Sequence, residues 1–184
     1  MAVGTSRDGV VVAQDMDQAA DANRAAFIEL IEPVLPDAYR LAVAMLRSDS
    51  EAEDAVQEAV LNAWRHRGRF IPGSEMKPWL LAILANECRR MRRNRWWSVI
   101  KEPADFQRSP YEMPDARAAE GLRRAIHRLP HDQKMAVVLR YYLDLTFEEL
   151  AQILKISPKA AKSRTYRALD CLRLNPEVLN DERD

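Results

Sequence analysis

Apolar side chains recur every three or four positions along most of the chain, the spacing that gives a helix one buried face. Residues 137–143, VVLRYYL, have the composition of a strand, but they lie among helical patterns and no second segment offers a pairing strand. We therefore predict an all-α protein. The expected helices cover residues 24–46, 48–67, 76–97, 115–128, 132–143, 147–154 and 158–173.

Proline and capping residues indicate where the first helices break and begin. Pro33 and Pro36 are expected to kink or break the first helix, because a proline inside a helix removes a hydrogen bond and crowds the preceding turn. The second helix is expected to begin at Ser48 or Ser50. Ser50 and Glu53 have the spacing of a capping box, in which each side chain satisfies a backbone N–H of the first turn.

Segments without helical periodicity divide the chain. Residues 1–22 are polar and acidic and are predicted to form a mobile arm, and residues 98–114 contain three prolines and are typical of a flexible linker. An acidic tail, residues 175–184, follows the last helix. We predict two small helical domains, 23–97 and 115–174, joined by the linker.

The net charge of zero is a cancellation between segments of opposite sign. The chain has 28 basic and 28 acidic side chains; residues 1–64 hold 4 and 12 of them, residues 65–101 hold 10 and 2, and residues 153–174 hold 6 and 1. Charge segregated in this way indicates two different kinds of partner. No apolar run approaches the ~20 residues of a membrane span and no signal-peptide core is present, so we expect a cytoplasmic protein without membrane insertion.

The residue types that carry catalysis and metal binding are not arranged for either. Cys88 and Cys171 are far apart, and each is predicted to be a reduced core residue, with a redox sensor as the alternative. His127 and His131 are four residues apart, but Pro130 breaks the helix between them and no carboxylate completes a zinc motif. The sequence contains neither a glycine-rich phosphate loop nor a nucleophile elbow. We therefore expect no cofactor, no metal and no enzymatic activity.

Residues 146–169, TFEELAQILKISPKAAKSRTYRAL, have the layout of a helix-turn-helix. Thr146 and Glu149 form a capping box at the start of the first helix, and Ser157 caps the second. The second helix of such a unit enters the major groove, where outward side chains meet base edges and flanking cations meet phosphates. The alternative is a basic, solvated helix of a plain bundle. The predicted contacts are Lys159, Ser163 and Arg167, with Lys162 and Arg164 as positioning charges.

A second basic cluster lies at residues 85–97, ANECRRMRRNRWW, where five arginines fall within seven residues and two tryptophans follow. Like charges three and four positions apart repel on an isolated helix, so an anionic partner would relieve the repulsion. Arginine beside aromatic rings suits single-stranded or distorted nucleic acid, whose bases can stack. The alternative is a solvated helix end with packed tryptophans. Two other tryptophans, Trp64 and Trp79, are predicted to be core residues.

Residues 50–66, SEAEDAVQEAVLNAWRH, are an acidic segment, in contrast to the two basic ones. Its alanines and valines form an apolar stripe, which leaves Asp54, Glu58 and their neighbours exposed. A negative face does not bind DNA unaided, so this face is either solvated or in contact with a protein. The residues alone slightly favour solvation.

Taken together, these segments resemble the bacterial extracytoplasmic-function (ECF, group IV) sigma factors of the sigma-70 family. The resemblance covers about residues 24–174. It rests on EAEDAVQEAVLNAW, on RF followed by KPWLLAILANECRR, on LRRAIHRLPHDQKMAVVLRYYLDLTFEELAQILKIS, and on KSRTYRAL, in the family's order. It implies an RNA polymerase specificity subunit with an N-terminal sigma-2 and a C-terminal sigma-4 domain, which reads the −35 duplex and opens the −10 element.

The resemblance also assigns a partner to each surface. It places the acidic helix on the clamp helices of the largest polymerase subunits, through Asp54, Gln57 and Glu58, and so reverses the preference for solvation. It places Phe70 and Asn86 at the pocket for a flipped −10 base, and Arg89, Arg90 and Arg93 against the promoter backbone. It places Lys159, Lys162, Ser163, Arg164 and Arg167 at the −35 element. An anti-sigma factor is a further expected partner.

Two other functions remain open from the residues. One is an autonomous helix-turn-helix transcriptional regulator that acts by occupancy, without binding polymerase. The other is a helical adaptor whose basic blocks bind acidic proteins, for which DNA affinity would lack a steep salt dependence.

Overall fold

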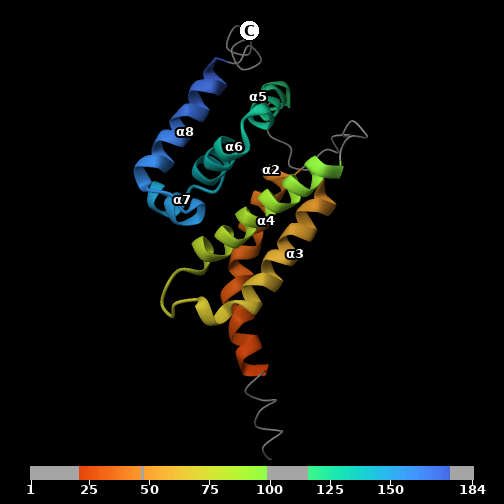
Figure 1. Cartoon of the computed structure of the whole chain (residues 1–184), viewed down its shortest axis with the longest axis vertical. Helices are drawn as coiled ribbons and strands as arrows, with labels where there is room; N and C mark the ends of the chain where they lie inside the picture. Colours follow the sequence, from red (N-terminus) through yellow and green to blue (C-terminus); the bar gives the residue numbers. More distant parts are fainter. Residues whose placement is uncertain (1–20, 47, 99–115, 175–184) are drawn as a thin grey trace, which may run out of the picture.

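A computed structural model describes the backbone of residues 21–46, 48–98 and 116–174, and the side chains of these residues except 94–98 and 116–120. All regular structure in these ranges is helical, which confirms the predicted fold class (Figure 1). Most of the predicted arm, linker and tail lies outside the described residues, and so do the side chains of Arg95, Trp96 and Trp97.

The N-terminal unit is a bundle in which the first helix is broken where its prolines predict. Pro33 and Pro36 each occupy the first turn of a new helical segment. A backbone N–H has no partner within the helix there, so proline, which lacks this N–H, loses no hydrogen bond. The first helix already includes residues 21 and 22, which the residue pattern assigns to the arm. In chain order the elements are a helix over residues 21–31, η1 (Glu32–Val34), α2 (Leu35–Met45), α3 (Asp49–Arg65), η2 (Arg67–Arg69) and α4 (Met76–Ser98).

Helix α3 begins at Asp49, with Ser48 as its N-cap. Ser48 has the extended backbone of a cap residue (φ −140°, ψ 154°), and its hydroxyl accepts a hydrogen bond from the Glu51 N–H at 3.2 Å. Ser50 lies inside the first turn, so the predicted capping box of Ser50 with Glu53 is wrong. The earlier start is favourable because Asp49 and Glu51 then place negative charge at the positive end of the helix dipole.

The C-terminal unit departs from the predicted pattern at one place, where the helix expected over 132–143 changes to a wider π turn after Val137. The turn ends at Tyr142, and Asp144, two residues later, has a left-handed φ of 52°. This geometry buries Leu139, Leu143 and Leu145 together. The elements are α5 (Ala116–Arg128), α6 (His131–Val137), η3 (Val138–Tyr142), α7 (Phe147–Leu154) and α8 (Pro158–Arg173).

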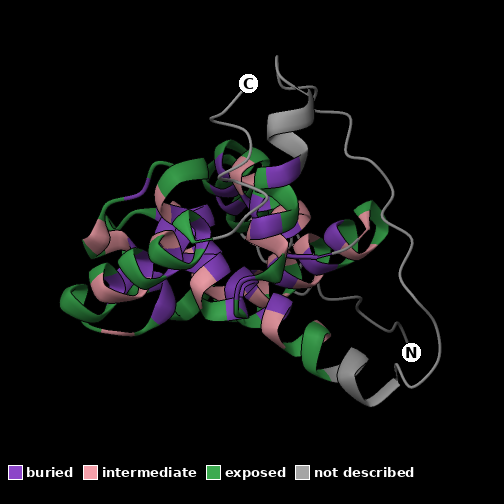
Figure 2. Cartoon of the chain, turned by 90° about the horizontal axis from the view of Figure 1, so that it is seen from above, coloured by how far each residue is buried: buried purple, intermediate pink, exposed green. Residues whose placement is uncertain are grey.

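Helix α4 joins the two units. It packs against α2 and α3 on one side and against α7 on the other (Figure 1). Leu81 and Leu84 of α4 and Leu150 and Ile153 of α7 are fully buried in one continuous core. Figure 2 shows the buried positions on the inward faces of the helices. The two predicted domains are therefore in direct contact, which the residue pattern did not predict.

His131, at the start of α6, is buried and held neutral. It is 9% exposed, and its Nε2 atom finds no hydrogen-bond partner among the described residues. Burial and then the positive charge of Arg92 lower the pKa of His131 to about 4; Arg89 and Lys134 act in the same direction and Asp132 acts against it.

Lowering the pH from 7.5 to 5 is expected to reduce the free energy of unfolding by about 2 kcal/mol through His131 alone. The pKa of this histidine falls from 6.5 to about 4 on folding. Its contribution to the free energy of unfolding is therefore complete above pH 6.5 and is lost as the pH falls towards 4. Urea unfolding at the two pH values measures the change. His131→Leu should flatten the profile, whereas His66→Gln, at an exposed site, should keep the wild-type slope. Equal slopes for wild type and His131→Leu would contradict this assignment.

Candidate nucleic-acid interface

The two helices of the helix-turn-helix, α7 and α8, begin with the caps that the sequence predicts. The Thr146 hydroxyl accepts from the Glu149 N–H at 3.2 Å, and the Glu149 carboxylate accepts from the Thr146 N–H at 2.6 Å. Hydrogen bonding to Thr146 lowers the pKa of Glu149 in spite of the opposing effect of burial. At α8 the Ser157 hydroxyl accepts from the Ala160 N–H at 3.2 Å. Both helices therefore start at defined residues.

The turn between α7 and α8 is as short as predicted. Lys155 ends α7 in the left-handed conformation, with φ 54°. The Ile156 N–H then donates to the Ala151 carbonyl at 3.0 Å, a C-terminal pattern that stops the helix and reverses the chain. Ile156 packs against the core at this corner, so the turn is held by an apolar contact as well as by hydrogen bonds.

One face of α8 is buried and the opposite face carries the predicted DNA contacts. Ala161, Thr165, Ala168 and Leu172 are buried, and the Thr165 hydroxyl donates to the Ala161 carbonyl at 3.0 Å, so no polar group is left unsatisfied there. Of the predicted contacts, Lys159, Lys162 and Arg167 are exposed, and Ser163 and Arg164 are half-buried.

Two arginines of α8 differ in how freely they can meet DNA. Arg167 donates to the Ser163 hydroxyl at 2.9 Å, a bond within the outward face that keeps the guanidinium there. Arg164 lies 3.7 Å from the Asp132 carboxylate at the start of α6, so its charge is already partly compensated.

Two neighbouring aromatic rings beside α8 are flanked by two cations. The Lys162 ammonium lies 5.9 Å from the centre of the Tyr166 ring, the Tyr166 and Phe147 rings are 6.4 Å apart, and the Arg140 guanidinium lies 5.4 Å from the Phe147 ring. Tyr166 is exposed on the outward side of α8. Phe147 and Arg140 were missed, because only the fold brings their helices beside α8.

The second basic cluster lines an open hollow of about 700 Å³ between α3, α4 and the helix-turn-helix. It contains four of the five residues predicted for the −10 element: Asn86, Arg89, Arg90 and Arg93. The rest of the wall is Asn62, His66, Arg69, Trp79, Ile83, Glu87 and Lys155. A cationic hollow with an indole and an amide in its wall can hold an unstacked base and the phosphate beside it.

Phe70, the fifth predicted residue, stands behind this wall. Its ring packs on Trp79 with 5.2 Å between the ring centres, and Trp79 lines the hollow. Both rings are half-buried, as is Trp64, which packs on Phe27 at 5.2 Å. Trp79, predicted to be a core residue, thus also forms part of the site surface.

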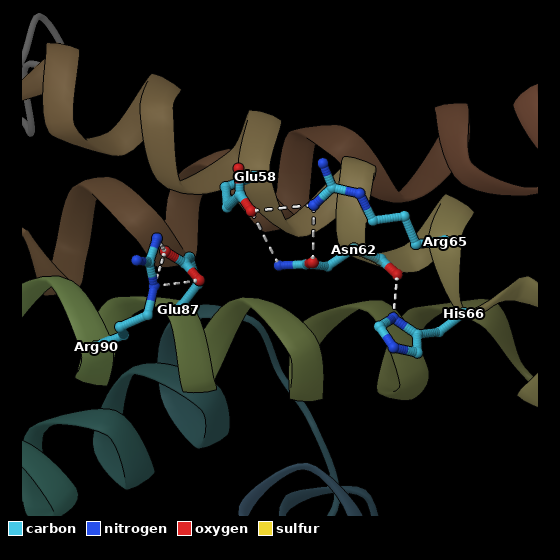
Figure 3. A network of polar contacts seen from close by, with 6 residues as sticks. All are labelled: Glu58, Asn62, Arg65, His66, Glu87 and Arg90. Atoms are coloured by element: carbon cyan, nitrogen blue, oxygen red, sulfur yellow. Dashed lines mark hydrogen bonds and ion pairs between the residues drawn. The ribbon is translucent and has the colours of Figure 1, made fainter.

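Short-range pairs orient the polar side chains of α4. Arg89 donates to the side-chain oxygen of Asn86, an exposed residue, at 3.0 Å. Arg90 donates through Nε to both Glu87 oxygens at 2.8 and 3.0 Å, and its second nitrogen contacts the same carboxylate (Figure 3). Glu87 is only 5% exposed, and this bond raises the pKa of Arg90. Glu87 was missed, although a glutamate three residues before an arginine on a helix is a pairing signal.

The acidic face of α3 forms a second, smaller hollow with α4, on the other side of Arg90 and Glu87. Asp54 and Gln57 are exposed, and Glu58 is half-buried; the Glu58 carboxylate accepts from Asn62 at 3.4 Å and from Arg65 at 3.5 Å (Figure 3). Leu61, 48% exposed, lies in the same hollow.

The two cysteines occupy different environments. Cys88 is fully buried, and burial raises its pKa to about 12, so its thiol stays protonated and unreactive. Cys171 is exposed, so the prediction that it is a core residue is wrong: it lies beside the apolar stripe of α8, not on it. Among the described residues no group of His, Cys, Asp or Glu could hold a metal ion, and no helix is long and apolar enough to span a membrane.

Family models match both units. A model described as sigma-70 region 2 matches residues 30–98, and one described as sigma-70, region 4 matches residues 119–172. The two matches leave between them the segment predicted as a linker.

Named relatives extend over most of the chain. It is 32% identical over 163 residues to the RNA polymerase sigma factor CarQ of Myxococcus xanthus, covering 86% of this chain and 93% of the relative. It is 31% identical to the ECF RNA polymerase sigma factor SigM of Mycobacterium tuberculosis, covering 79% and 74%. The fold matches the sigma factor RpoE in its complex with the anti-sigma factor NepR from Bartonella quintana, with a TM-score of 0.70, 28% identity, and coverage of 86% and 99%.

Proposed function

Since the chain belongs to the extracytoplasmic-function sigma factors of the sigma-70 family, we propose that its two cationic surfaces divide the reading of a promoter between them. The protein is an RNA polymerase sigma factor, and it directs core polymerase to promoters by reading the −35 duplex and opening the −10 element. What is proposed is which residues perform each task.

In the proposal, α8 reads the −35 element as a duplex. Lys159 and Ser163 lie in the N-terminal half of α8, where a recognition helix meets base edges, and Arg167 follows one turn after Ser163. Lys162 and Arg164 neutralise phosphates and position the helix. The ring of Tyr166, beside Lys162, adds an apolar surface of the kind that contacts a thymine methyl group.

The hollow on α4 is proposed to take the −10 element as separated strands. The Asn86 amide, whose oxygen accepts a hydrogen bond from Arg89, can recognise the edge of an extruded base through its N–H groups. Trp79, supported from behind by Phe70, offers a ring on which the base can stack, while Arg89, Arg90 and Arg93 meet the phosphates. Capture of the base offsets the few kcal/mol needed to remove it from the stack.

The hollow on α3 is proposed to dock on the clamp helices of the polymerase, through Asp54, Gln57 and Glu58 around the exposed Leu61. Binding to polymerase then holds both DNA surfaces on one scaffold. Each surface binds DNA weakly by itself, but tethering raises the effective concentration of the second site once the first is occupied.

Further assignments follow from family membership. Sigma factors are non-catalytic initiation factors, and we propose that this chain has no enzymatic activity of its own. We also propose that it works in the cytoplasm, where polymerase and chromosome are. Structures similar to it are complexes with anti-sigma factors, which supports an anti-sigma factor as a partner here as well.

The observation that carries the proposal is that four of the five predicted −10 residues line one hollow, whereas the predicted −35 residues lie on a different helix. Transcription with purified core polymerase over a library with both promoter elements randomised tests it. Two separate conserved blocks should emerge among the transcribed sequences. A single block, or transcription without any preference, would exclude two-surface reading. An autonomous regulator would fail to co-elute with core polymerase in gel filtration.

A further inference from the structure

The wall of the cationic hollow on α4 contains a buried carboxylate. Among the described residues that line this hollow, five are arginine or lysine and only Glu87 is acidic. Glu87 is 5% exposed, so its charge is largely removed from water. A negative charge in this position opposes the binding of a phosphate, and burial makes it costly unless a neighbour compensates it.

Arg90 compensates this charge by a side-on pair. Its Nε donates to both Glu87 oxygens, at 2.8 and 3.0 Å, and its Nη2 contacts the same carboxylate (Figure 3). A guanidinium held along this edge presents its other edge, with Nη1, in a plane that the carboxylate fixes. The Arg90 side chain is 51% exposed, so the pair has one buried member and one member that a ligand can reach.

The pair stands at the boundary between the hollows on α4 and α3, because Glu87 and Arg90 line both. Glu58 of α3 lines the second hollow with them. The hydrogen bond and the charge of Glu87, and then the charge of Glu58, raise the pKa of Arg90. If Arg90 turned away from this boundary, it would leave a buried charge without its partner, which is strongly unfavourable.

We propose that Glu87 is a positioning residue for the −10 element: it holds the Arg90 guanidinium in one orientation, so that Arg90 meets one phosphate of a correctly seated strand. This role rests on the proposed function, in which Arg90 contacts the −10 strand. The carboxylate also cancels most of the charge of Arg90, which lowers the attraction of the hollow for strands of any sequence. Both effects favour a strand whose extruded base fits beside Asn86.

Glu87→Gln, which keeps the shape of the side chain and removes its charge, tests this role in the complex with core polymerase. The probes are two fluorescent single-stranded DNAs, the −10 block selected from the randomised library and a scrambled strand of the same composition. The scrambled strand should bind about 3- to 10-fold more tightly, with a salt slope steeper by about 0.7, because one more cation is uncompensated. The matched strand should change by less than about twofold, since lost orientation offsets the added charge.

Arg90→Lys separates orientation from charge. Lysine keeps the cation but lacks the planar fork that binds along a carboxylate edge. This variant should bind the matched strand about 3- to 10-fold more weakly, with the salt slope unchanged. The control is Glu53→Gln, which removes a charge from an exposed position of α3 that lines neither hollow. It should bind both strands within about twofold of wild type.

Two outcomes would overturn the positioning role. Equal tightening of both strands by Glu87→Gln would leave the carboxylate with charge compensation alone. Unchanged binding of both strands, with a lower free energy of unfolding in urea as the one effect, would make the pair with Arg90 purely structural.

A measurement on the free chain separates this inference from the proposed function. The Nε–H signal of Arg90 in nuclear magnetic resonance spectra is identified by its absence from Arg90→Lys. This proton should exchange with water about tenfold more slowly in the wild type than in Glu87→Gln. Equal exchange would show that Glu87 does not hold Arg90. Slow exchange in a chain whose library yields no −10 block would instead refute the proposed −10 surface.

Discussion

Reversing two charges on α3, with Asp54→Lys and Glu58→Lys together, is expected to weaken binding to core polymerase by about 100-fold or more. Placing like charges across an interface costs several kcal/mol, and each 1.4 kcal/mol is tenfold in affinity. Both side chains line the hollow on α3 beside the exposed Leu61, so the change falls on the proposed contact. Titration of labelled sigma factor with core polymerase, read by fluorescence anisotropy, measures the dissociation constant.

The matched control is the pair Glu29→Lys and Glu32→Lys. These glutamates are exposed in the same unit, and their reversal changes the net charge by the same amount, but they do not line the hollow. The control should bind within about threefold of wild type at physiological salt, where charges far from an interface are screened. If both pairs weakened binding equally, the effect would be one of overall charge and α3 would not be the docking surface.

The second large effect is that two substitutions should impair two different steps of transcription, binding to the −35 duplex and strand opening. Arg167→Ala should weaken binding to the −35 duplex about 5- to 100-fold, the range for loss of a base-edge contact, with strand opening on the remaining complexes unchanged. Asn86→Ala should leave −35 binding intact and reduce opening about tenfold or more, because the extruded base loses its hydrogen bonds. Permanganate reactivity of unpaired thymines, with a mobility-shift assay on the same promoter, measures both.

Arg167 is preferred to Arg164 for this experiment because Arg164 also pairs with Asp132, so its removal would combine the loss of a DNA contact with the loss of that ion pair. Arg173→Ala is the control on the same helix: it is exposed at the far end of α8 and pairs with Asp170. If Arg167→Ala and Asn86→Ala gave the same footprint defect, the division of labour between the surfaces would be refuted.

Features that depend on a few neighbouring residues could be predicted from the sequence. The capping box at Thr146, the cap at Ser157 and the break at Pro33 each follow from hydrogen bonds or steric contacts within one turn of the chain. The start of α3 was less certain, because Ser48 and Ser50 are both good caps. Ser48 became the cap through its extended backbone and its bond to Glu51.

Features that depend on packing between distant segments could not be predicted. The wider turn of η3 serves the burial of Leu139 and Leu143, and no local signal distinguishes it from an ordinary helix. Phe70 was expected in the wall of the base pocket, but it does not line the hollow on α4 and instead packs against Trp79, which does. The prediction for Cys171 was wrong because this residue borders the apolar stripe of α8. At that border, a shift of one position along the helix moves a side chain from the core to the surface.

Sequence alone thus determined the helical class, the helix-turn-helix, the two basic blocks and the acidic helix, since periodicity, caps and charge are properties of short stretches. Tertiary structure alone decided that the two basic blocks meet through Asp132 and that Lys155 reaches the hollow on α4. The physical reason is that these contacts join segments more than thirty residues apart in the chain, where position is set by the burial of α4 against α7 and not by any local pattern.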